Sequence, residues 1–537
     1  MAPIHVEPEI SYSGAALVAI HILSIVFFIQ KVVSSLLHSN HALPVSQDVK
    51  IRMAARRQLG WIFYGLALLS LGVAAYAGVA YASLSFESWA DERGVGSPPS
   101  AFQGMPTNAS TNQTHATNQT YDFVFDRIRW LEDTPIYQDA FEIVAEKARR
   151  FWWGQQIDLA MLPWAVFMTV EGHRRGISNL FSFLALAHLV NLSFAQNAFY
   201  MALILTPVPL PEELLPSTRW NRTRNYISPP KPRNWCLKPG FFLLPLMASY
   251  VSIFTLPYAA GTPWFNRVLF ISRGLSFIPL LLQNTAPPSM GIALPQKRRA
   301  DPAYTDLFRF MGLVTVVLHG RATFNGLTYN LPHAHYHRHS KILPWDIEER
   351  SRWERTTTAI GKILGATRDH PVVAGIGYDV LISALSVGLW AALRPLGAGD
   401  ILSSVVPLFK GDGNGADTTD HVSDDHETKD IDEPSTPAMR RSGRNRKAAS
   451  EDHTDPSETP APRRRGRPRK SKRDPIEEPG DLTYEPTPEE KISASVGDPL
   501  PMQGPVGEPA ALAWGLTSIG GLALGSVGVF GGELLAQ

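Results

Sequence analysis

The stretch FWWGQQIDLAMLPWAVFMTVEGHRRGISNLFSFLALAHLVNLSFAQNAFYMALILTP, residues 151–207, decides the fold. It holds two apolar runs, about 151–170 and 178–205, joined by a short basic turn. A hydrocarbon core is crossed by roughly 20 helical residues, so each run is long enough to cross it. Because backbone polar groups must be satisfied internally in lipid, we expect both runs to be helices.

Both runs also carry polar side chains that a lipid-facing helix avoids. They are Gln155, Gln156, Asp158 and Glu171 in the first run, and His188, Asn191, Ser193, Gln196 and Asn197 in the second. We therefore expect the pair of helices to turn these groups toward other protein and to form one wall of an intramembrane site.

The bulk composition excludes several classes of protein. The chain has 537 residues and a formal net charge of +1, which implies no global attraction to nucleic acid. A single cysteine, Cys236, excludes an internal disulfide and a cysteine-based zinc site. We expect Cys236 to be a packing residue rather than a nucleophile.

The apolar runs predict an all-α fold, a polytopic transmembrane helical bundle of about seven to nine spans with a disordered C-proximal tail. The tail is expected to be disordered because it is too poor in apolar residues to offset its ordering entropy. The predicted parts are an N-terminal transmembrane hairpin (1–84), a lumenal loop with amphipathic helices (85–150), a transmembrane core (151–395) with a soluble His-rich loop (330–370), the tail (396–509) and a Gly-rich apolar helix (510–537).

Charge and glycosylation signals give an orientation. The leading tail lacks Lys and Arg and the loop after the first run is basic, which places the N-terminus in the lumen. Three glycosylation acceptors in segment 85–150, Asn108, Asn112 and Asn118, agree with that side. We therefore expect an endomembrane protein, most simply of the endoplasmic reticulum. However, counting every run as a span puts the tail and the later basic loops in the lumen, unless one span among 238–325 is re-entrant.

Three intramembrane acids are the candidate catalytic groups: Asp158, Glu171 and Asp379. Burial disfavours the charged carboxylate, and a neutral acid among aromatic side chains is what protonation of an olefin or an epoxide requires. Aromatic faces also stabilise a passing carbocation. The alternative is that Asp158 and Asp379 are structural hydrogen-bonding groups and that Glu171 ends a helix beside Arg174 and Arg175.

The expected substrate-binding residues surround these acids in sequence. They are Trp152, Trp153, Gln155, Gln156, Asn191, Ser193, Gln196 and Asn197. Hydrogen bonding between helices is the alternative role for the amide and hydroxyl groups.

No metal or cofactor is expected. A prenyl transferase that ionises a diphosphate holds Mg²⁺ with clustered carboxylates, and no DDxxD pattern stands on an apolar run. The segment HAHYHRH, residues 333–339, is one histidine cluster in a Pro-flanked loop, which favours a solvated basic loop over a metal site.

The tail contains PRRRGRPRK, residues 462–470, which resembles an AT-hook. Arg465 and Arg467 would enter the narrow minor groove of A·T tracts, or contact anionic lipid. A membrane-tethered DNA-binding protein is therefore one alternative function.

Four parts of the sequence carry a family resemblance: the aromatic pair Trp152–Trp153, the pair Gln155–Gln156, the EGHRR turn at Glu171–Arg175 and the SFAQN segment at Ser193–Asn197. They resemble fungal integral-membrane terpene cyclases of the ascochlorin and macrophorin biosynthetic type. The resemblance implies metal-independent cyclisation of a lipophilic, prenylated (meroterpenoid) precursor, started by protonation. The long 85–150 loop, the His-rich loop and the tail depart from the family pattern. A non-enzymatic multipass membrane protein, a scaffold or a transporter, therefore stays open as the alternative.

Overall fold

The structure is a computed structural model that describes part of the chain. The described residues are 12–41, 50–95, 125–206, 235–293, 302–339, 341–342, 345–394, 396–406 and 507–536. The chain divides into two units, residues 1–412 with 487–537 and residues 413–486, and every described residue belongs to the first unit.

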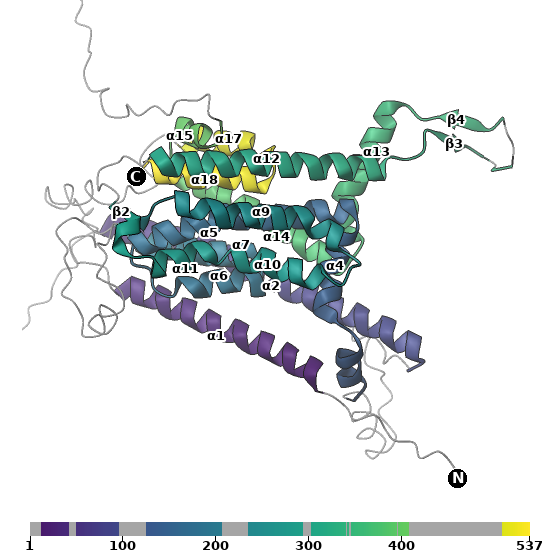
Figure 1. Cartoon of the computed structure of the whole chain (residues 1–537), viewed down its shortest axis with the longest axis horizontal. Coiled ribbons are helices and arrows are strands. Elements are labelled where there is room, and N and C mark those ends of the chain that lie inside the picture. Colours follow the sequence, from purple (N-terminus) through teal and green to yellow (C-terminus); the bar gives the residue numbers. More distant parts are fainter. Residues whose placement is uncertain are drawn as a thin grey trace, which may run out of the picture. The chain divides into compact units, whose positions relative to one another are not determined.

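The described part is all-α, as predicted, apart from two short antiparallel strand pairs (Figure 1). The bounds of the principal helices are α1 Ser13–His41, α2 Lys50–Arg93, α4 Ile136–Glu146, α5 Ala148–Arg174, α6 Leu180–Leu189, α7 Leu192–Leu205, α9 Gly240–Ala259, α10 Phe265–Leu275, α11 Ile278–Thr285, α12 Pro302–Asn330, α13 Arg352–Leu364, α14 Pro371–Leu393, α15 Ala398–Val405, α17 Gly507–Ser518 and α18 Leu522–Ala536. The strand pairs are β1 Trp235–Leu237 with β2 Gly291–Ala293, and β3 His335–His337 with β4 Ile347–Glu349.

Five helices are long and apolar enough to cross a membrane: α1, α2, α9, α12 and α14. The bent pair α10–α11, which turns by 45° at its break, is a sixth candidate if it counts as one span. Helix α5 is less apolar, but its sides are covered by other helices, and nearly every residue from Phe151 to Gly172 is buried. It is therefore the central helix of the unit.

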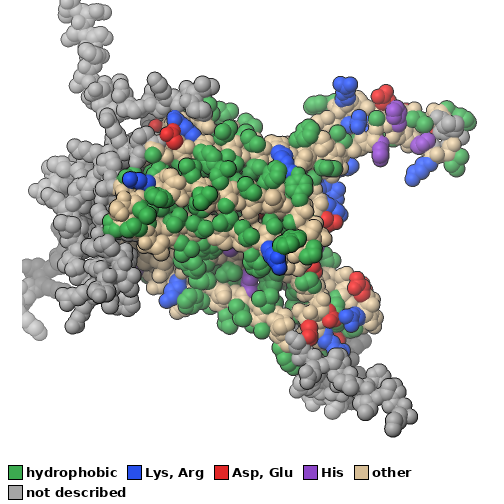
Figure 2. All heavy atoms as spheres, viewed as in Figure 1, with side chains coloured by type: hydrophobic (Ala, Val, Ile, Leu, Met, Phe, Trp, Pro, Cys, Tyr) green, Lys and Arg blue, Asp and Glu red, His purple; other side chains and the backbone are tan. Residues whose placement is uncertain are grey.

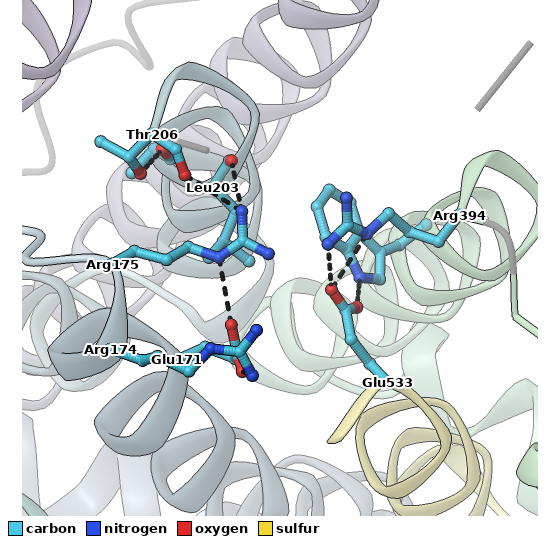
Figure 3. Close-up of polar contacts among 9 residues, drawn as sticks. Glu171, Arg174, Arg175, Leu203, Thr206, Arg394 and Glu533 are labelled. Atoms are coloured by element: carbon cyan, nitrogen blue, oxygen red, sulfur yellow. Dashed lines mark hydrogen bonds and ion pairs between the residues drawn. The ribbon is translucent and has the colours of Figure 1, made fainter. Parts of the chain in front are cut away.

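One end of the unit, which we call the basic end, gathers the last residues of several helices. Arg174 ends α5, Arg175 follows it, and Arg394 follows α14 in the same close view (Figure 3). Strand β1 lies there too, because Cys236 of β1 is close enough to Glu171, near the end of α5, for the glutamate charge to affect its thiol. The start of α12 is at the same end, because the Tyr304 hydroxyl donates to the Leu237 carbonyl of β1. The opposite end holds the helix at residues 125–133, α4 and α13.

The second apolar run, predicted as one helix, is a helical hairpin instead. It breaks at Val190–Asn191 into α6 and α7. The helices are antiparallel, because the Phe183 and Phe199 rings lie 5.7 Å apart near the base, and Arg175 donates to the Thr206 carbonyl at 3.0 Å. The hairpin therefore enters and leaves at the basic end, and its tip lies inside the unit.

The C-terminal Gly-rich run, predicted as one helix, is a second helical hairpin. Helices α17 and α18 meet at Gly521, whose φ of +98° is in the left-handed region that favours glycine. A Cβ on Gly525 would lie 3.1 Å from Nε1 of Trp514, which fits antiparallel packing. At the tip, the backbone N–H of Leu522 donates to Oε1 of Gln156 at 3.3 Å, so this hairpin is attached to α5.

Segment 330–370, predicted as a soluble loop, is more ordered than expected. It forms the β3–β4 hairpin and α13, which extend from the end of α12 (Figures 1 and 2). Cross-strand contacts fix the hairpin: the Tyr336 hydroxyl donates to Glu348, and the Arg350 guanidinium lies over the Tyr336 ring. The amphipathic helices predicted before α5 correspond to the helix at residues 125–133 and to α4.

Gly531 lets α18 approach α15 closely, which gives a stability prediction. A Cβ there would lie 2.7 Å from Cβ of Ser404, whereas nothing lies within 4 Å of a Cβ on Gly515 of α17. We expect Gly531→Ala to destabilise the fold by about 1–3 kcal/mol through overpacking. Gly515→Ala should leave stability unchanged or raise it by up to about 1 kcal/mol, because Ala favours helix. Thermal unfolding in detergent measures both; equal effects would contradict the close packing of α18.

Candidate functional site

The tip of the α6–α7 hairpin is a pair of helix ends inside the unit, which need hydrogen-bond partners. Asp379 of α14 supplies them: its carboxylate accepts from the backbone N–H of Leu192 at 3.1 Å and of Ser193 at 2.8 Å. The Asn191 side chain accepts from the N–H of Phe194 and donates to the Ser70 carbonyl of α2. Asp379 therefore caps α7, and the partial positive charge at the N-terminus of that helix stabilises the negative charge of the carboxylate.

A closed hydrogen-bond network lies on the other side of the tip, between α6 and the break of α10–α11. Ser276 donates its hydroxyl proton to the Arg273 carbonyl at 2.7 Å, so its oxygen accepts from Nε2–H of His188 at 2.7 Å. Nδ1 of His188 is then the acceptor for Arg273, at 3.4 Å. The network assigns a neutral His188 with its proton on Nε2.

Asp158 joins this network through Arg273. Its Oδ1 lies 3.5 Å from Nη2 of Arg273, and its side chain keeps 16 % of its surface accessible. Within the described part of the chain its second oxygen has no hydrogen-bond partner. Asp158 thus contacts the Arg273 guanidinium and has one oxygen left for a ligand, whereas both oxygens of Asp379 accept from the first N–H groups of α7.

Glu171 lies elsewhere, at the basic end. It is fully buried and pairs with Arg174 and Arg175, each at 3.1 Å (Figure 3). Arg175 also donates to the carbonyls of Leu203 and Thr206, so this group ties the end of α5 to the base of the α6–α7 hairpin. Glu171 is about 13 residues, or roughly 20 Å of helix, from Asp158. It belongs to an ion-pair network and is not placed beside the other two acids.

A second buried carboxylate at the basic end, that of Glu533, was not among the predicted site residues. Glu533 of α18 accepts from Nε of Arg394 at 3.0 Å and from the Trp390 indole N–H (Figure 3). It joins the last residues of α14 to α18. The sequence signal that could have indicated it is a single Glu in a Gly-rich apolar run, because a buried carboxylate needs a charged or hydrogen-bonding partner.

The expected substrate-binding residues lie at several different places in the unit. Asn191 and Ser193 lie at the hairpin tip, whereas Gln196 and Asn197 are fully buried farther along α7. The other four bond to neighbouring elements: Trp152 to Thr323, Trp153 to the Ile363 carbonyl, Gln155 to the Leu318 carbonyl and Gln156 to Leu522. Their known contacts therefore join helices, as in the alternative interpretation.

Aromatic rings lie close to the charged groups of the tip. The Arg273 guanidinium lies 4.6 Å from the centre of the Phe141 ring, and the His188 ring stacks on Phe277 at 5.2 Å. Phe181 in turn lies 5.3 Å from Phe277. The surroundings of Asp158 and Arg273 thus combine charged groups with aromatic faces.

Several predicted residues lie outside the described part of the chain. They are Asn108, Asn112, Asn118, Arg465 and Arg467. Within the described part, no group of three or more His, Cys, Asp or Glu side chains is arranged to hold a metal ion, the histidines of β3 included.

Comparison of the chain with protein-family models, with curated proteins and with solved structures finds no match.

The cap at the hairpin tip predicts a strong stability effect. Asp379→Ala leaves two buried N–H groups without a partner, each at a cost of about 1–3 kcal/mol, so we expect a loss of about 2–6 kcal/mol. Ser383→Ala, one turn farther along α14, is the matched control, because the Ser383 hydroxyl has no protein partner among the described residues. Thermal unfolding in detergent compares them. Equal melting temperatures would show that Asp379 is not the cap.

Cys236 should be unreactive in the folded protein. It is buried in β1, and burial raises the pKa of its thiol to about 12. The reactive thiolate is therefore scarce at pH 8 and shielded from reagents. We expect labelling by a thiol reagent to be at least tenfold slower in the native protein than after denaturation, as measured by mass spectrometry. Rapid native labelling would contradict the buried position of β1.

Proposed function

We propose that the chain is an integral membrane protein with seven crossing segments and two hairpins that enter from the basic end. The crossing segments are the five apolar helices, the bent pair α10–α11, and α5. The supporting observation is the surface: hydrophobic side chains cover the face seen in Figure 2, whereas charged side chains gather toward its edges and on the arm formed by the β3–β4 hairpin and α13. Leu244, Phe270 and Leu313, on α9, α10 and α12, are each at least 66 % exposed, as expected for contact with lipid.

This arrangement also gives an orientation that agrees with the positive-inside rule. Thr206, β1, β2 and the start of α12 lie at the basic end, so the sequence segments that connect them, 207–234 and 294–301, begin and end there. Both segments are rich in Lys and Arg. We therefore assign the basic end to the cytosol, and the opposite end, with segment 96–124, to the lumen of an endomembrane compartment.

Glycosylation mapping tests the orientation. Segment 96–124 would face the lumen, so its three acceptor asparagines should each carry an N-glycan. We therefore expect Asn108→Gln, Asn112→Gln and Asn118→Gln each to lower the apparent mass on a gel by one glycan, and glycosidase treatment to remove the remaining difference. Asn221, in a matching acceptor sequence in the cytosolic segment 207–234, is the control, and Asn221→Gln should change nothing. Loss of a glycan in the Asn221 variant alone would invert the orientation.

For the activity, we propose a metal-independent, acid-initiated terpene cyclase that acts on a prenylated precursor. The observation that carries this proposal is the position of Asp158, whose side chain is partly accessible, next to a guanidinium group and aromatic rings. In its protonated form Asp158 would donate its proton to an olefin or to an epoxide oxygen. Arg273 would then stabilise the remaining carboxylate, and loss of a proton from the final carbocation would give an isomer of the substrate.

The roles of the three acids follow from their contacts. Asp379 holds the hairpin tip and thereby positions His188, which contacts Arg273. Glu171 stabilises the base of the hairpin through Arg175. Asp158 is the one proposed to contact substrate, and the rings of Phe141 and Phe277 lie where aromatic faces would stabilise positive charge.

The activity is tested in microsomes with an epoxy-prenyl phenol. We expect a cyclised product of unchanged mass, and a loss of at least 100-fold in Asp158→Asn, because the amide has no acidic proton to donate. Asp306→Asn, at an exposed position of α12, is the control for carboxylate removal and should keep the wild-type rate. Turnover that survives in Asp158→Asn would remove this acid from the mechanism.

A transporter is the second candidate, favoured by the two helical hairpins. Half-depth helices whose ends meet polar groups inside the membrane are typical of transporters, and the N-terminus of α7 at Asp379 has this form. Uptake of a small charged solute by proteoliposomes, with no cyclised product in the assay above, would favour this candidate.

A further inference from the structure

Helix α13 has two apolar faces, and one of them is turned away from the unit. Ala359 and Ile363 are buried on the face that packs against the other helices. Trp353, Ile360 and Leu364, by contrast, are 78 %, 43 % and 52 % exposed. Because the last three are spaced by seven and four residues, they form one stripe along the helix. An exposed apolar stripe of this kind marks a contact surface.

Hydrogen bonds show which way the stripe faces. Nε of Arg355 donates to the Pro332 carbonyl at 3.1 Å, and Nζ of Lys362 donates to the Asn330 carbonyl at 3.3 Å. At 3.6 residues per turn, Arg355 and Lys362 lie on the flank of α13 opposite to Ile360. The polar flank therefore meets the end of α12, and the apolar stripe faces away from it.

The position of α13 places the stripe at the depth of the membrane surface. Helix α13 lies where three crossing helices begin or end, at the end of the unit opposite the basic end. The Trp153 indole N–H, near the start of α5, donates to the Ile363 carbonyl at 3.0 Å, and α14 begins at Pro371. Figure 1 shows α13 running across the direction of α12 at the end of that helix. A helix in this position lies along the membrane plane.

Exposed aromatic side chains mark the same depth on neighbouring helices. Tyr258 near the end of α9, Trp264 before α10 and Tyr329 near the end of α12 are all exposed. The Arg267 guanidinium lies 4.5 Å from the centre of the Trp264 ring. Trp and Tyr are enriched where a membrane protein meets the lipid headgroups. The stripe of α13 thus continues the lipid-facing surface of the spans at its headgroup edge.

The charge of α13 fits a phospholipid surface. The helix holds the basic residues Arg352, Arg355 and Lys362 and the acidic residue Glu354, a net formal charge of +2. Basic groups on the polar side of a helix contact lipid phosphates, while an apolar side that contains Trp enters the boundary between headgroups and acyl chains. Both features are present in α13.

We propose that α13 lies in the headgroup region of the leaflet opposite the basic end, with Trp353, Ile360 and Leu364 turned into the lipid. It thereby anchors the base of the β3–β4 arm to the membrane surface. This docking rests on the proposed insertion of the unit into a membrane, and a lipid-facing position on α12 checks that insertion separately.

Spin-label accessibility of the full chain in phosphatidylcholine nanodiscs tests the docking. Single cysteines are introduced in a Cys236→Ala background at the three stripe positions. Glu354→Cys and Thr358→Cys, exposed on the polar side of the same helix, are matched controls. Molecular oxygen concentrates in lipid, whereas a neutral Ni(II) chelate stays in water. We expect the ratio of the oxygen to the chelate collision rate to be about threefold or more higher at the stripe than at the controls.

Two reference positions separate the outcomes. Leu313→Cys reports the lipid-facing surface of α12, and Trp345→Cys, at an exposed position of the arm, reports water. A stripe that matches Trp345→Cys while Leu313→Cys is in lipid overturns the docking and leaves the integral membrane protein standing. If Leu313→Cys also behaves as water-exposed, the proposed insertion fails and the docking fails with it. Low collision rates with both reagents at the stripe would show that a second copy of the chain covers it, which also overturns the proposal.

Discussion

The bond between Asp379 and the first N–H groups of α7 is the constraint on which the candidate site depends. A helix that begins inside a protein leaves several N–H groups without partners, and no water from the surface reaches them. The carboxylate on α14 satisfies two of them. Because the tip of the hairpin is thereby fixed, His188 just before it is held against Arg273 and Ser276, and α7 is set in register with α14.

The buried charges of this protein have different roles because their partners differ. Glu171 and Glu533 are each held by arginine and join helix ends at the basic end. Removing one partner of such a buried pair leaves an uncompensated charge, so these groups specify which ends meet. Asp379 is satisfied by backbone N–H groups. Of these four acids, Asp158 is the one that combines a contact at 3.5 Å with remaining accessibility, and that difference distinguishes a candidate reactive group from structural ones.

Under the proposed topology, the α6–α7 hairpin removes the orientation conflict in the sequence. Counting 178–205 as one crossing helix places the tail and the basic connecting segments in the lumen. A hairpin that begins and ends at the basic end adds no net crossing, so in the proposed topology the basic segments share one side. The bent pair α10–α11 lies within 238–325, where the sequence suggested a re-entrant span, and its 45° break fits either a broken span or a re-entrant loop.

Residue composition alone determined the all-α class, the positions of α1, α2, α9, α12 and α14, and the presence of acids within apolar runs, because hydropathy over about 20 residues is a local property. It did not determine that Asn191 and Gly521 are turning points, since each break is stabilised by distant groups, Asp379 for the first and Gln156 for the second. Only the tertiary structure separated Glu171 from Asp158, which lie on one helix, and brought Asp379 from a distant helix to the N-terminus of α7. Contacts between residues far apart in the chain are set by packing, which local sequence patterns do not encode.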